Sequence, residues 1–258
     1  MIVNSEEEKN ILREGGLLLA EILNRLKEML HPGIAADVLE NEARRMIKDL
    51  KATPAFLGYT PKGAPRPYPS ALCVSVNEEI VHGIPNERPK IILDGDIVTL
   101  DCGIVYEGLI TDSAVSVIAG IGEKRDKELV QSVYEALMAG IDAAVVGAKI
   151  GDIGYAIEQV EKKYNVKAPN ELGGHGVGRS VHEEPFVPNW GKKGKGETIV
   201  DGMVIAIEPM FSLGTREVVL RRDGYTYITK DGSKAAHAEH TILITNEGTE
   251  ILTKHKNE

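Results

Sequence analysis

The sequence of 258 residues is poor in cysteine and in large aromatic side chains. It contains two cysteines, Cys73 and Cys102, together with one tryptophan and three phenylalanines. Two cysteines exclude the disulfide framework of a small secreted domain and suit a reducing compartment. The first ten residues, MIVNSEEEKN, are acidic where a secretory signal would be basic. We therefore expect a cytoplasmic protein.

The sequence also lacks a long apolar run and an excess of positive charge. No segment approaches the roughly 20 apolar residues that cross a bilayer, so we expect no membrane span. The 30 basic residues are outnumbered by 39 acidic ones, which gives a net charge of −9. This balance argues against a dedicated nucleic-acid-binding protein. The composition, 42% hydrophobic and 27% charged, is otherwise typical of a globular protein, and we expect one domain over residues 1–258.

Hydrophobic periodicity predicts the same order of elements twice along the chain. Apolar residues recur every three or four positions in four segments that we expect to be helical, residues 5–30, 37–50, 124–146 and about 153–164. After the first helical pair, residues 62–70 predict a loop rich in proline and glycine, and residues 72–76 and 97–100 predict short buried strands. Strand-like runs follow the second pair as far as Thr245.

One local match supports a duplication of the chain. Residues 94–101 (DGDIVTLD) and residues 201–208 (DGMVIAIE) each combine an Asp-Gly turn, an apolar strand and a final carboxylate. An Asp-Gly turn before an apolar run is also a common hairpin signal, so chance is the alternative explanation. The match favours two halves related by pseudo-twofold symmetry, residues 5–120 and 121–250. Two such halves would place the final carboxylates near a shared seam.

A candidate metal site begins at the hairpin that follows the first of these carboxylates. Glu107-Gly108 is a two-residue turn signal between apolar runs, and it places Asp112 opposite Gly103. Asp101 then projects from the same face as a diagonal neighbour of Asp112, roughly 7–8 Å away. Two metal ions about 3.5–4 Å apart fit such a gap. A pair of acids on one face is therefore a better ligand candidate than a single turn aspartate.

Two further carboxylates stand at strand ends. Glu208 closes the apolar run of residues 203–207, and Glu239 precedes the apolar run of residues 241–244. Burying such an acid is costly unless it is paired or holds a cation. Some such coincidences are expected among 39 acidic residues, so chance is the alternative to the carboxylate-rich dimetal site that the pattern favours.

Three histidines each allow two interpretations. His175 lies among the glycines of residues 173–178, where some other group must approach the backbone closely, and it is either a metal ligand or a structural histidine. His182 is a site residue or part of a polar surface, and His82 is a site residue or a turn histidine near Pro85. The glycine spacing fits neither a nucleotide fingerprint nor a lysine-bearing phosphate loop.

Together these residues resemble the type I methionine aminopeptidases, which have the pita-bread fold. The resemblance covers nearly the whole chain and rests on motifs in the same order: Ser75-Val76-Asn77-Glu78 running into His82-Gly83-Ile84-Pro85, Asp101 with Asp112, Gly174-His175-Gly176-Val177-Gly178 with His182-Glu183-Glu184-Pro185, Ile207-Glu208-Pro209, and Glu239-His240-Thr241. It implies an α+β fold whose pseudo-twofold duplicated halves share a central, mainly antiparallel sheet flanked by helices.

The resemblance also implies a site with two divalent metal ions, either cobalt, manganese, iron or zinc. It assigns Asp101 to one ion, Asp112 and Glu239 to both as bridging ligands, and His175 and Glu208 to the other. Four carboxylates would balance the charge of two divalent cations. Oxygen-rich ligation with one imidazole suits these cations better than a structural thiolate site.

The implied activity is the hydrolytic removal of the N-terminal methionine from nascent proteins and peptides whose second residue is small. Glu208 would move the proton of the attacking water to the leaving amine. By similarity, His182 would contact the carbonyl oxygen of the substrate and His82 its peptide nitrogen. The residues that we expect to line the methionine pocket are Tyr59, Tyr68, Cys73 and Tyr225.

Two alternatives remain open. A proline-specific aminopeptidase or dipeptidase shares this fold and the same ligand types, although its usual form carries an extra N-terminal domain. A ligand-free relative would bind protein or RNA without catalysis, but it would have no reason to keep an unpaired buried acid cluster. We expect a monomer, and the lysine-rich loop of residues 191–196 is either a transient ribosome contact or a solvated hairpin.

Overall fold

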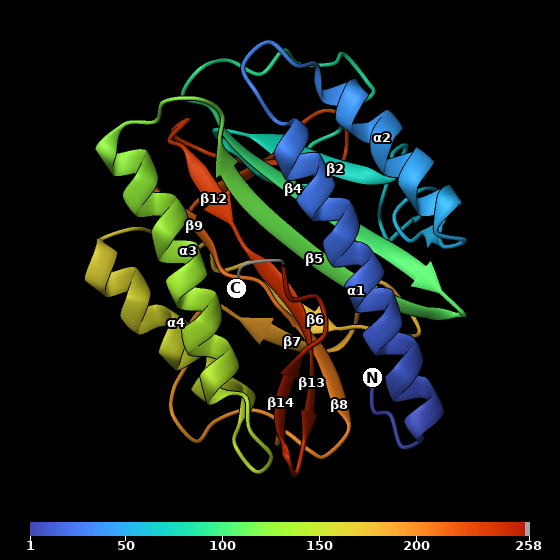
Figure 1. The fold of residues 1–258 in the computed structure, drawn as a ribbon. Helices are drawn as coiled ribbons and strands as arrows, with labels where there is room; N and C mark the ends of the chain where they lie inside the picture. Colours follow the sequence, from blue (N-terminus) through green and yellow to red (C-terminus); the bar gives the residue numbers. More distant parts are fainter. Residues whose placement is uncertain (256–258) are drawn as a thin grey trace.

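The computed structural model describes residues 1–255 as four helices and fourteen strands. The helices are α1 (Glu6–Met29), α2 (Ala36–Asp49), α3 (Lys124–Ala143) and α4 (Ile150–Tyr164). The strands are β1 (Thr53–Pro54), β2 (Leu72–Val76), β3 (Glu79–Val81), β4 (Ile97–Tyr106), β5 (Leu109–Ile118), β6 (Gly173–Gly176), β7 (Glu183–Pro188), β8 (Met203–Ile207), β9 (Met210–Ser212), β10 (Val218–Leu220), β11 (Tyr227–Thr229), β12 (Ala235–His237), β13 (Glu239–Thr245) and β14 (Gly248–Ile251). In Figure 1 the four helices lie in front of the sheets, with α1 and α2 on one side and α3 and α4 on the other.

The predicted helices are confirmed, and their ends follow from local chemistry. The side chain of Ser5 accepts a hydrogen bond from the backbone N–H of Glu8 at 3.2 Å, so it caps the start of α1. Asn165 ends α4 in the left-handed conformation, with a φ of 51°. Two boundaries differ from the prediction, because α3 ends at Ala143 and α4 begins at Ile150, where the Asp152 carboxylate accepts a hydrogen bond from the backbone N–H of Lys149.

Strands β4 and β5 form the predicted hairpin. Glu107 and Gly108 have φ values of 45° and 85°, the left-handed conformations that a two-residue hairpin turn requires. Gly103 pairs with Asp112, and Asp101 pairs with Ala114, so the two aspartates share a face as diagonal neighbours. The sequence prediction that Asp101 follows its strand is wrong, since hairpin pairing extends β4 beyond it as far as Tyr106.

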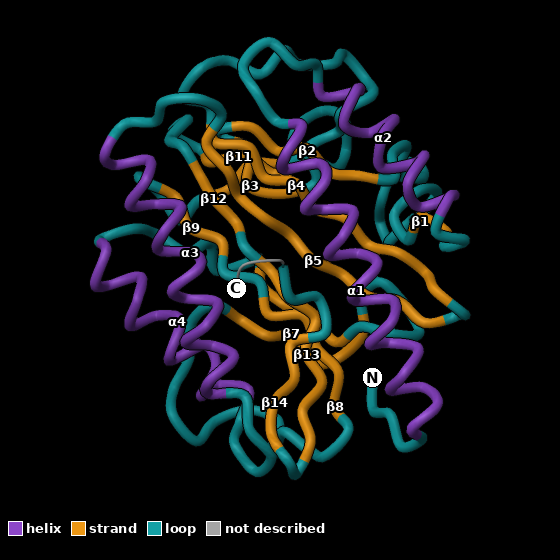
Figure 2. Tube along the Cα trace, in the orientation of Figure 1, coloured by secondary structure: helices purple, strands orange, loops and turns teal. Residues whose placement is uncertain are grey.

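The largest sheet contains nine strands in the order β1-β4-β5-β13-β8-β6-β7, with β2 paired to β4 and β14 paired to β13. The hairpin β4–β5 thus meets the antiparallel pair β8–β13 where β5 pairs with β13. The two copies of the repeated sequence lie in β4 and β8, which flank the β5–β13 pair on either side. Short strands of distant origin form two smaller sheets, β10-β11-β3 and β12-β9, which the sequence did not predict (Figure 2).

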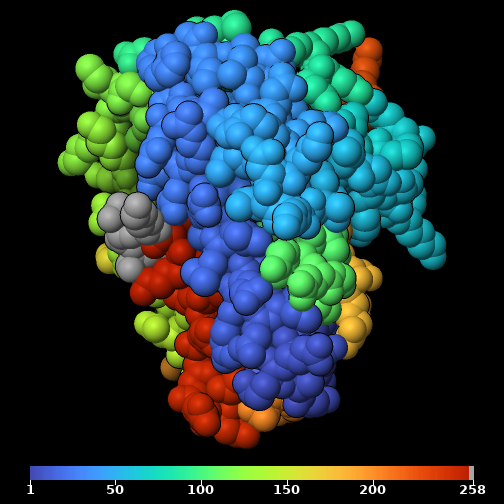
Figure 3. All heavy atoms as spheres, turned by 45° about the vertical axis from the view of Figure 1, so that its right-hand side comes forward, coloured from blue at the N-terminus to red at the C-terminus, as the bar shows by residue number. Residues whose placement is uncertain are grey.

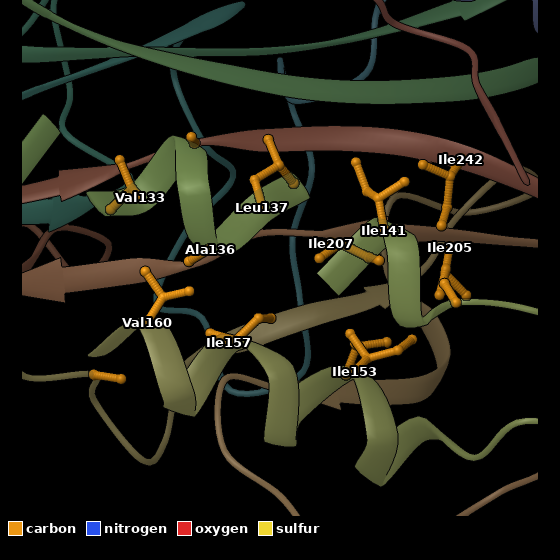
Figure 4. Packing of buried hydrophobic residues seen from close by; sticks show 14 of the residues in the cluster. Val133, Ala136, Leu137, Ile141, Ile153, Ile157, Val160, Ile205, Ile207 and Ile242 are labelled. Carbon is orange, nitrogen blue, oxygen red and sulfur yellow. The ribbon is translucent and has the colours of Figure 1, made fainter. Parts of the chain in front are cut away.

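Each helical pair covers its own hydrophobic core. Figure 4 shows side chains of α3 and α4, among them Leu137, Ile141 and Ile157, packed with Ile207 of β8 and Ile242 of β13. A second core joins α1 and α2 to β2 and β4, and its buried members include Leu19, Leu23, Leu39, Val74 and Leu100. The two cores fix the helices against the strands that carry the candidate ligands.

The first two helices form a continuous outer face. In Figure 3 the N-terminal part of the chain, which includes both helices, occupies the middle of the visible surface, and the tip of the β4–β5 hairpin emerges beside it. Within residues 1–255 no helix is both long enough and apolar enough to cross a membrane.

Candidate metal centre and substrate cleft

The predicted site residues line one cavity of about 750 Å³. This cavity lies where the two halves of the large sheet meet, since Asp101 and Asp112 come from the β4–β5 hairpin and Glu208 and Glu239 from the β8–β13 pair. The residues that the sequence predicted and that line the cavity are Asp101, Asp112, His175, Glu208, Glu239, His82, His182, Tyr59, Tyr68, Cys73 and Tyr225. None of the predicted site residues lies elsewhere.

Four buried carboxylates form the floor of the cavity. Burial raises the pKa of Asp112 to about 7. Burial, reinforced by the negative charge of neighbouring acids, raises the pKa of Asp101, Glu208 and Glu239 well above the usual range. Since a carboxylate is costly to bury without compensation, this floor favours any ligand that brings positive charge.

The donor set fits divalent cations. Asp101 Oδ1, Asp112 Oδ1 and Glu239 Oε1 are buried without a hydrogen-bond partner. Among residues 1–255 no lysine or arginine forms an ion pair with the four acids, and the ion-pair contacts of Glu208 and Glu239 are with His175 and His237. Ligand atoms of Asp112, His175 and Glu239 lie within 4.8 Å of one another, a spacing that could hold a metal ion.

His175 is oriented as a ligand. Its Nδ1 lies 2.9 Å from the carbonyl oxygen of Gly176, so Nδ1 carries the proton and Nε2 keeps a lone pair. Nε2 lies 3.3 Å from Glu208 Oε1. Burial lowers the pKa of His175 to about 3, so the ring is neutral at neutral pH. A lone pair facing a carboxylate is unfavourable unless a cation lies between them, and this arrangement supports the ligand interpretation.

The glycines around His175 are explained by neighbouring strands. A Cβ at Gly174 would lie 2.2 Å from the carbonyl oxygen of Ala206, and one at Gly176 would lie 2.2 Å from that of Glu184. The predicted close approach to this backbone is therefore made by the neighbouring strands β8 and β7, and it holds His175 against Glu208.

His82 and His182 both line the cavity, and His182 is also exposed to solvent. The rings of His175 and His182 are 4.4 Å apart, and Tyr59 Oη lies 2.9 Å from His182 Nδ1. His82 adopts a φ of 60°, and the next residue, Gly83, donates its N–H to Ser75 Oγ at 3.1 Å. Burial and the nearby His182 lower the pKa of His82 to about 4. Both histidines thus line the same cavity as the four acids.

The four predicted pocket residues gather on one side of the cavity. Tyr68, Cys73 and Tyr225 are buried, and the rings of the two tyrosines lie 5.0 Å apart. The hydroxyl of Tyr225 donates to the carbonyl oxygen of Arg66, which ties the proline-rich loop to this wall. Sequence reasoning missed Phe56, a buried residue that also lines the cavity, because the loop that carries it has no regular periodicity.

Sequence reasoning also missed His237, which is buried at the end of β12. Its Nε2 lies 3.5 Å from Glu208 Oε2 and 3.7 Å from Glu239 Oε2. Burial lowers the pKa of His237 to about 3, so the ring is neutral. Its position two residues before Glu239 is the one sequence signal that could have drawn attention to it.

Comparison with known proteins decides the family. Residues 10–246 match the model of metallopeptidase family M24. The chain belongs to metallopeptidase family M24. Membership makes it a metal-dependent hydrolase, and the buried acids and histidines described above are the groups that such an enzyme needs.

Relatives in the M24 family match over nearly the whole chain. The methionine aminopeptidase of Aquifex aeolicus is 46% identical, over 97% of this chain and 97% of that protein. A crystal structure of methionine aminopeptidase from Thermotoga maritima superposes with a TM-score of 0.93 at 41% identity, covering 99% of this chain and 100% of that one. The pita-bread fold is therefore confirmed.

The prolidase from Pyrococcus furiosus shares this fold. Its structure superposes with a TM-score of 0.75 at 21% identity, and the match covers 99% of this chain but 66% of the prolidase. Nearly the whole of this chain therefore matches the prolidase, and the remaining part of the prolidase has no counterpart in the match.

Proposed function

We propose that this chain removes the N-terminal methionine from proteins and peptides whose second residue is small, by hydrolysis in a site with two divalent metal ions. The observation that carries the proposal is the buried cluster of four carboxylates and His175 at the floor of a cavity whose wall is aromatic. The full-length likeness to methionine aminopeptidases supports the substrate.

The proposed ligands are the five predicted residues. Asp101 would hold one ion, Asp112 and Glu239 would bridge both, and His175 with Glu208 would complete the other. Divalent ions at this position supply Lewis-acid activation of a water molecule and of the substrate carbonyl. The oxygen-rich ligand set suits cobalt, manganese or iron, with zinc as a further candidate.

Residues of the chain would carry out proton transfer and hold the substrate. The Glu208 carboxylate would accept a proton from the attacking water and deliver it to the leaving amine. His182, at the open side, would donate a hydrogen bond to the carbonyl oxygen as negative charge develops there, and His82 would contact the peptide nitrogen. The substrate's α-amino group would lie beside Asp101, and this contact would require a free N-terminus.

The cavity wall supports selection of methionine. Tyr59, Tyr68, Cys73 and Tyr225 line the cavity and would present apolar surface and one thiol to the first side chain of the substrate. With the α-amino group and the scissile amide both fixed, the second side chain would be pressed against the wall, and a long one would prevent the aligned geometry.

We place the protein in the cytoplasm as a monomer. Cys73 and Cys102 are free and buried, in keeping with a reducing compartment. The lysine-rich loop of residues 191–196 is exposed for most of its length, and it would make any transient contact with the ribosome near the exit of nascent chains.

A peptide panel tests the proposal. Metal-reconstituted protein is incubated with Met-Ala, Met-Lys and Xaa-Pro peptides, and released amino acid is quantified. We expect rapid cleavage of Met-Ala and little cleavage of Met-Lys. Efficient cleavage of Xaa-Pro with poor cleavage of Met-Ala would instead support a proline-specific peptidase, and no cleavage of any peptide would support a non-catalytic relative.

A further inference from the structure

His237 is held in place by its backbone and by complete burial. Its side chain is 1% exposed. Its backbone N–H donates to Ser116 Oγ at 2.9 Å, and Ser116 Oγ donates to its carbonyl oxygen at 2.7 Å. The pairing of β12 with β9 places His237 opposite Met210, immediately beyond the strand ends that carry Glu208 and Glu239. The ring therefore has little freedom to turn away from these acids.

The ring nitrogens have no hydrogen-bond partner, although both are buried. Nε2 faces two carboxylate oxygens, at 3.5 Å from Glu208 Oε2 and 3.7 Å from Glu239 Oε2. A neutral imidazole carries one N–H. If the proton were on Nδ1, that N–H would lack an acceptor and the Nε2 lone pair would face two anionic oxygens. A proton on Nε2 avoids both costs. A small shift of the ring would then bring the Nε2–H within hydrogen-bond distance of either carboxylate.

We propose that His237 is a positioning residue whose Nε2–H donates to the carboxylates of Glu208 and Glu239 and fixes their orientation in the metal site. This inference rests on the proposed function, because it concerns the same two acids. Carboxylates that ligate metals depend on such hydrogen bonds for their orientation, and loss of one typically weakens metal affinity or activity about 10- to 100-fold.

Two amide variants and one apolar variant of His237 distinguish the effect of its hydrogen-bond donation from the effect of its packing. His237→Gln keeps an N–H at a reach close to that of Nε2, whereas His237→Asn has the same amide on a shorter side chain. His237→Phe fills the space without donating. Cobalt affinity is measured by calorimetry, the environment of bound cobalt by its visible absorption, and turnover of a Met-Ala peptide as separate kcat and KM values.

We expect His237→Asn and His237→Phe to weaken cobalt affinity by about 10- to 100-fold, to alter the cobalt spectrum and to lower kcat with a smaller change in KM. His237→Gln should recover most of each property. Thermal unfolding of the metal-free variants shows whether they are folded, and the Asn–Gln comparison stands even if the Phe variant is not.

Equal cobalt affinity, spectrum and kcat in the Asn, Gln and wild-type proteins would overturn the inference. Failure of Gln to improve on Asn would also overturn it, because donation would then not be the decisive property. If instead the wild-type protein bound no cobalt or left Met-Ala uncut, the proposed function itself would be wrong, so the two failures are distinguishable.

Discussion

At the scale of single residues, Glu208 has two proposed roles, metal ligand and proton carrier, and one substitution can separate them. Glu208→Gln keeps the size of the side chain and one oxygen ligand but cannot accept a proton. We expect kcat on Met-Ala peptides to fall by about 100-fold or more, with a much smaller change in KM, because proton transfer acts mainly on the transition state. Steady-state kinetics on metal-loaded protein measures this.

A matched control is Glu247→Gln, which makes the same change on an exposed turn between β13 and β14. It should behave as the wild type. Near-normal kcat in a Glu208→Gln protein whose metal content matches that of the wild type would exclude Glu208 as the proton carrier.

Some of the candidate site residues could be predicted from the sequence, and others could not. The relative positions of Asp101 and Asp112 could be predicted because a two-residue turn fixes the pairing register of the two strands that it joins. Glu208 was predictable as a candidate because it ends a repeated strand. His237 was not, since its place depends on the pairing of β12 with β9, and nothing local in the sequence specifies that pairing.

At the scale of elements, β6 holds His175 because glycine allows the neighbouring backbone to come close. In Gly174→Ala the new Cβ would lie 2.2 Å from the Ala206 carbonyl oxygen, so β6 must move away from β8. Overpacking of this kind lowers the free energy of unfolding by about 1–3 kcal/mol. We also expect weaker metal binding, because His175 moves with the strand. Denaturant unfolding and metal calorimetry measure the two effects.

Gly15→Ala in α1 is the matched control, since its Cβ would meet its nearest neighbour at 3.4 Å, an ordinary contact. It should leave metal affinity unchanged and should not lower stability, since alanine favours the helix. If Gly174→Ala behaved like Gly15→Ala in both measurements, the close strand packing around His175 would not be what positions it.

Elements with strong local signals were predicted, among them the helices, the buried strand β2 and the β4–β5 hairpin. The two small sheets were not predicted. The small sheet β10-β11-β3 joins segments almost 150 residues apart, β3 at Glu79–Val81 and β11 at Tyr227–Thr229, so local patterns carry no information about it.

At the scale of the whole molecule, the acid cluster should make stability depend on pH and on metal. The folded-state pKa of Asp112 is raised from 3.8 to about 7, and those of the other three acids lie well above the usual range. Such groups stabilise the fold at low pH and lose that contribution as pH rises through the folded-state pKa. The lowered pKa values of His82, His175 and His237 make stability rise with pH, but only below pH 6.5, the ordinary pKa of histidine.

We therefore expect the melting temperature of the metal-free protein to fall as pH rises from 6.5 to about 8. Divalent ions bind the ionised carboxylates of the folded state, so saturating metal should raise the melting temperature and should reduce or reverse this slope. Calorimetric scans with and without chelator measure both. A metal-free protein whose stability rises over this range would show that the four acids are not held as described.

The fold as a whole was accessible from the sequence through its resemblance to a known family rather than through physics alone. The repeated segment and the two helical pairs suggested a duplicated chain, but they did not give the strand order. That order depends on β5 pairing with β13 through two residue pairs, Glu239 with Ala114 and His240 with Ser113. This narrow seam between the halves is also where the four acids meet.

The most direct test of the proposed metal-dependent activity is the Met-Ala arm of the peptide panel, followed while metal-free protein is titrated with cobalt or manganese. If the four acids and His175 hold the catalytic metal, no methionine is released without metal, activity rises with bound metal and saturates at no more than two ions per chain, and Asp112→Asn shows no recovery. Full activity in the chelated protein, or an unchanged titration in Asp112→Asn, would contradict it.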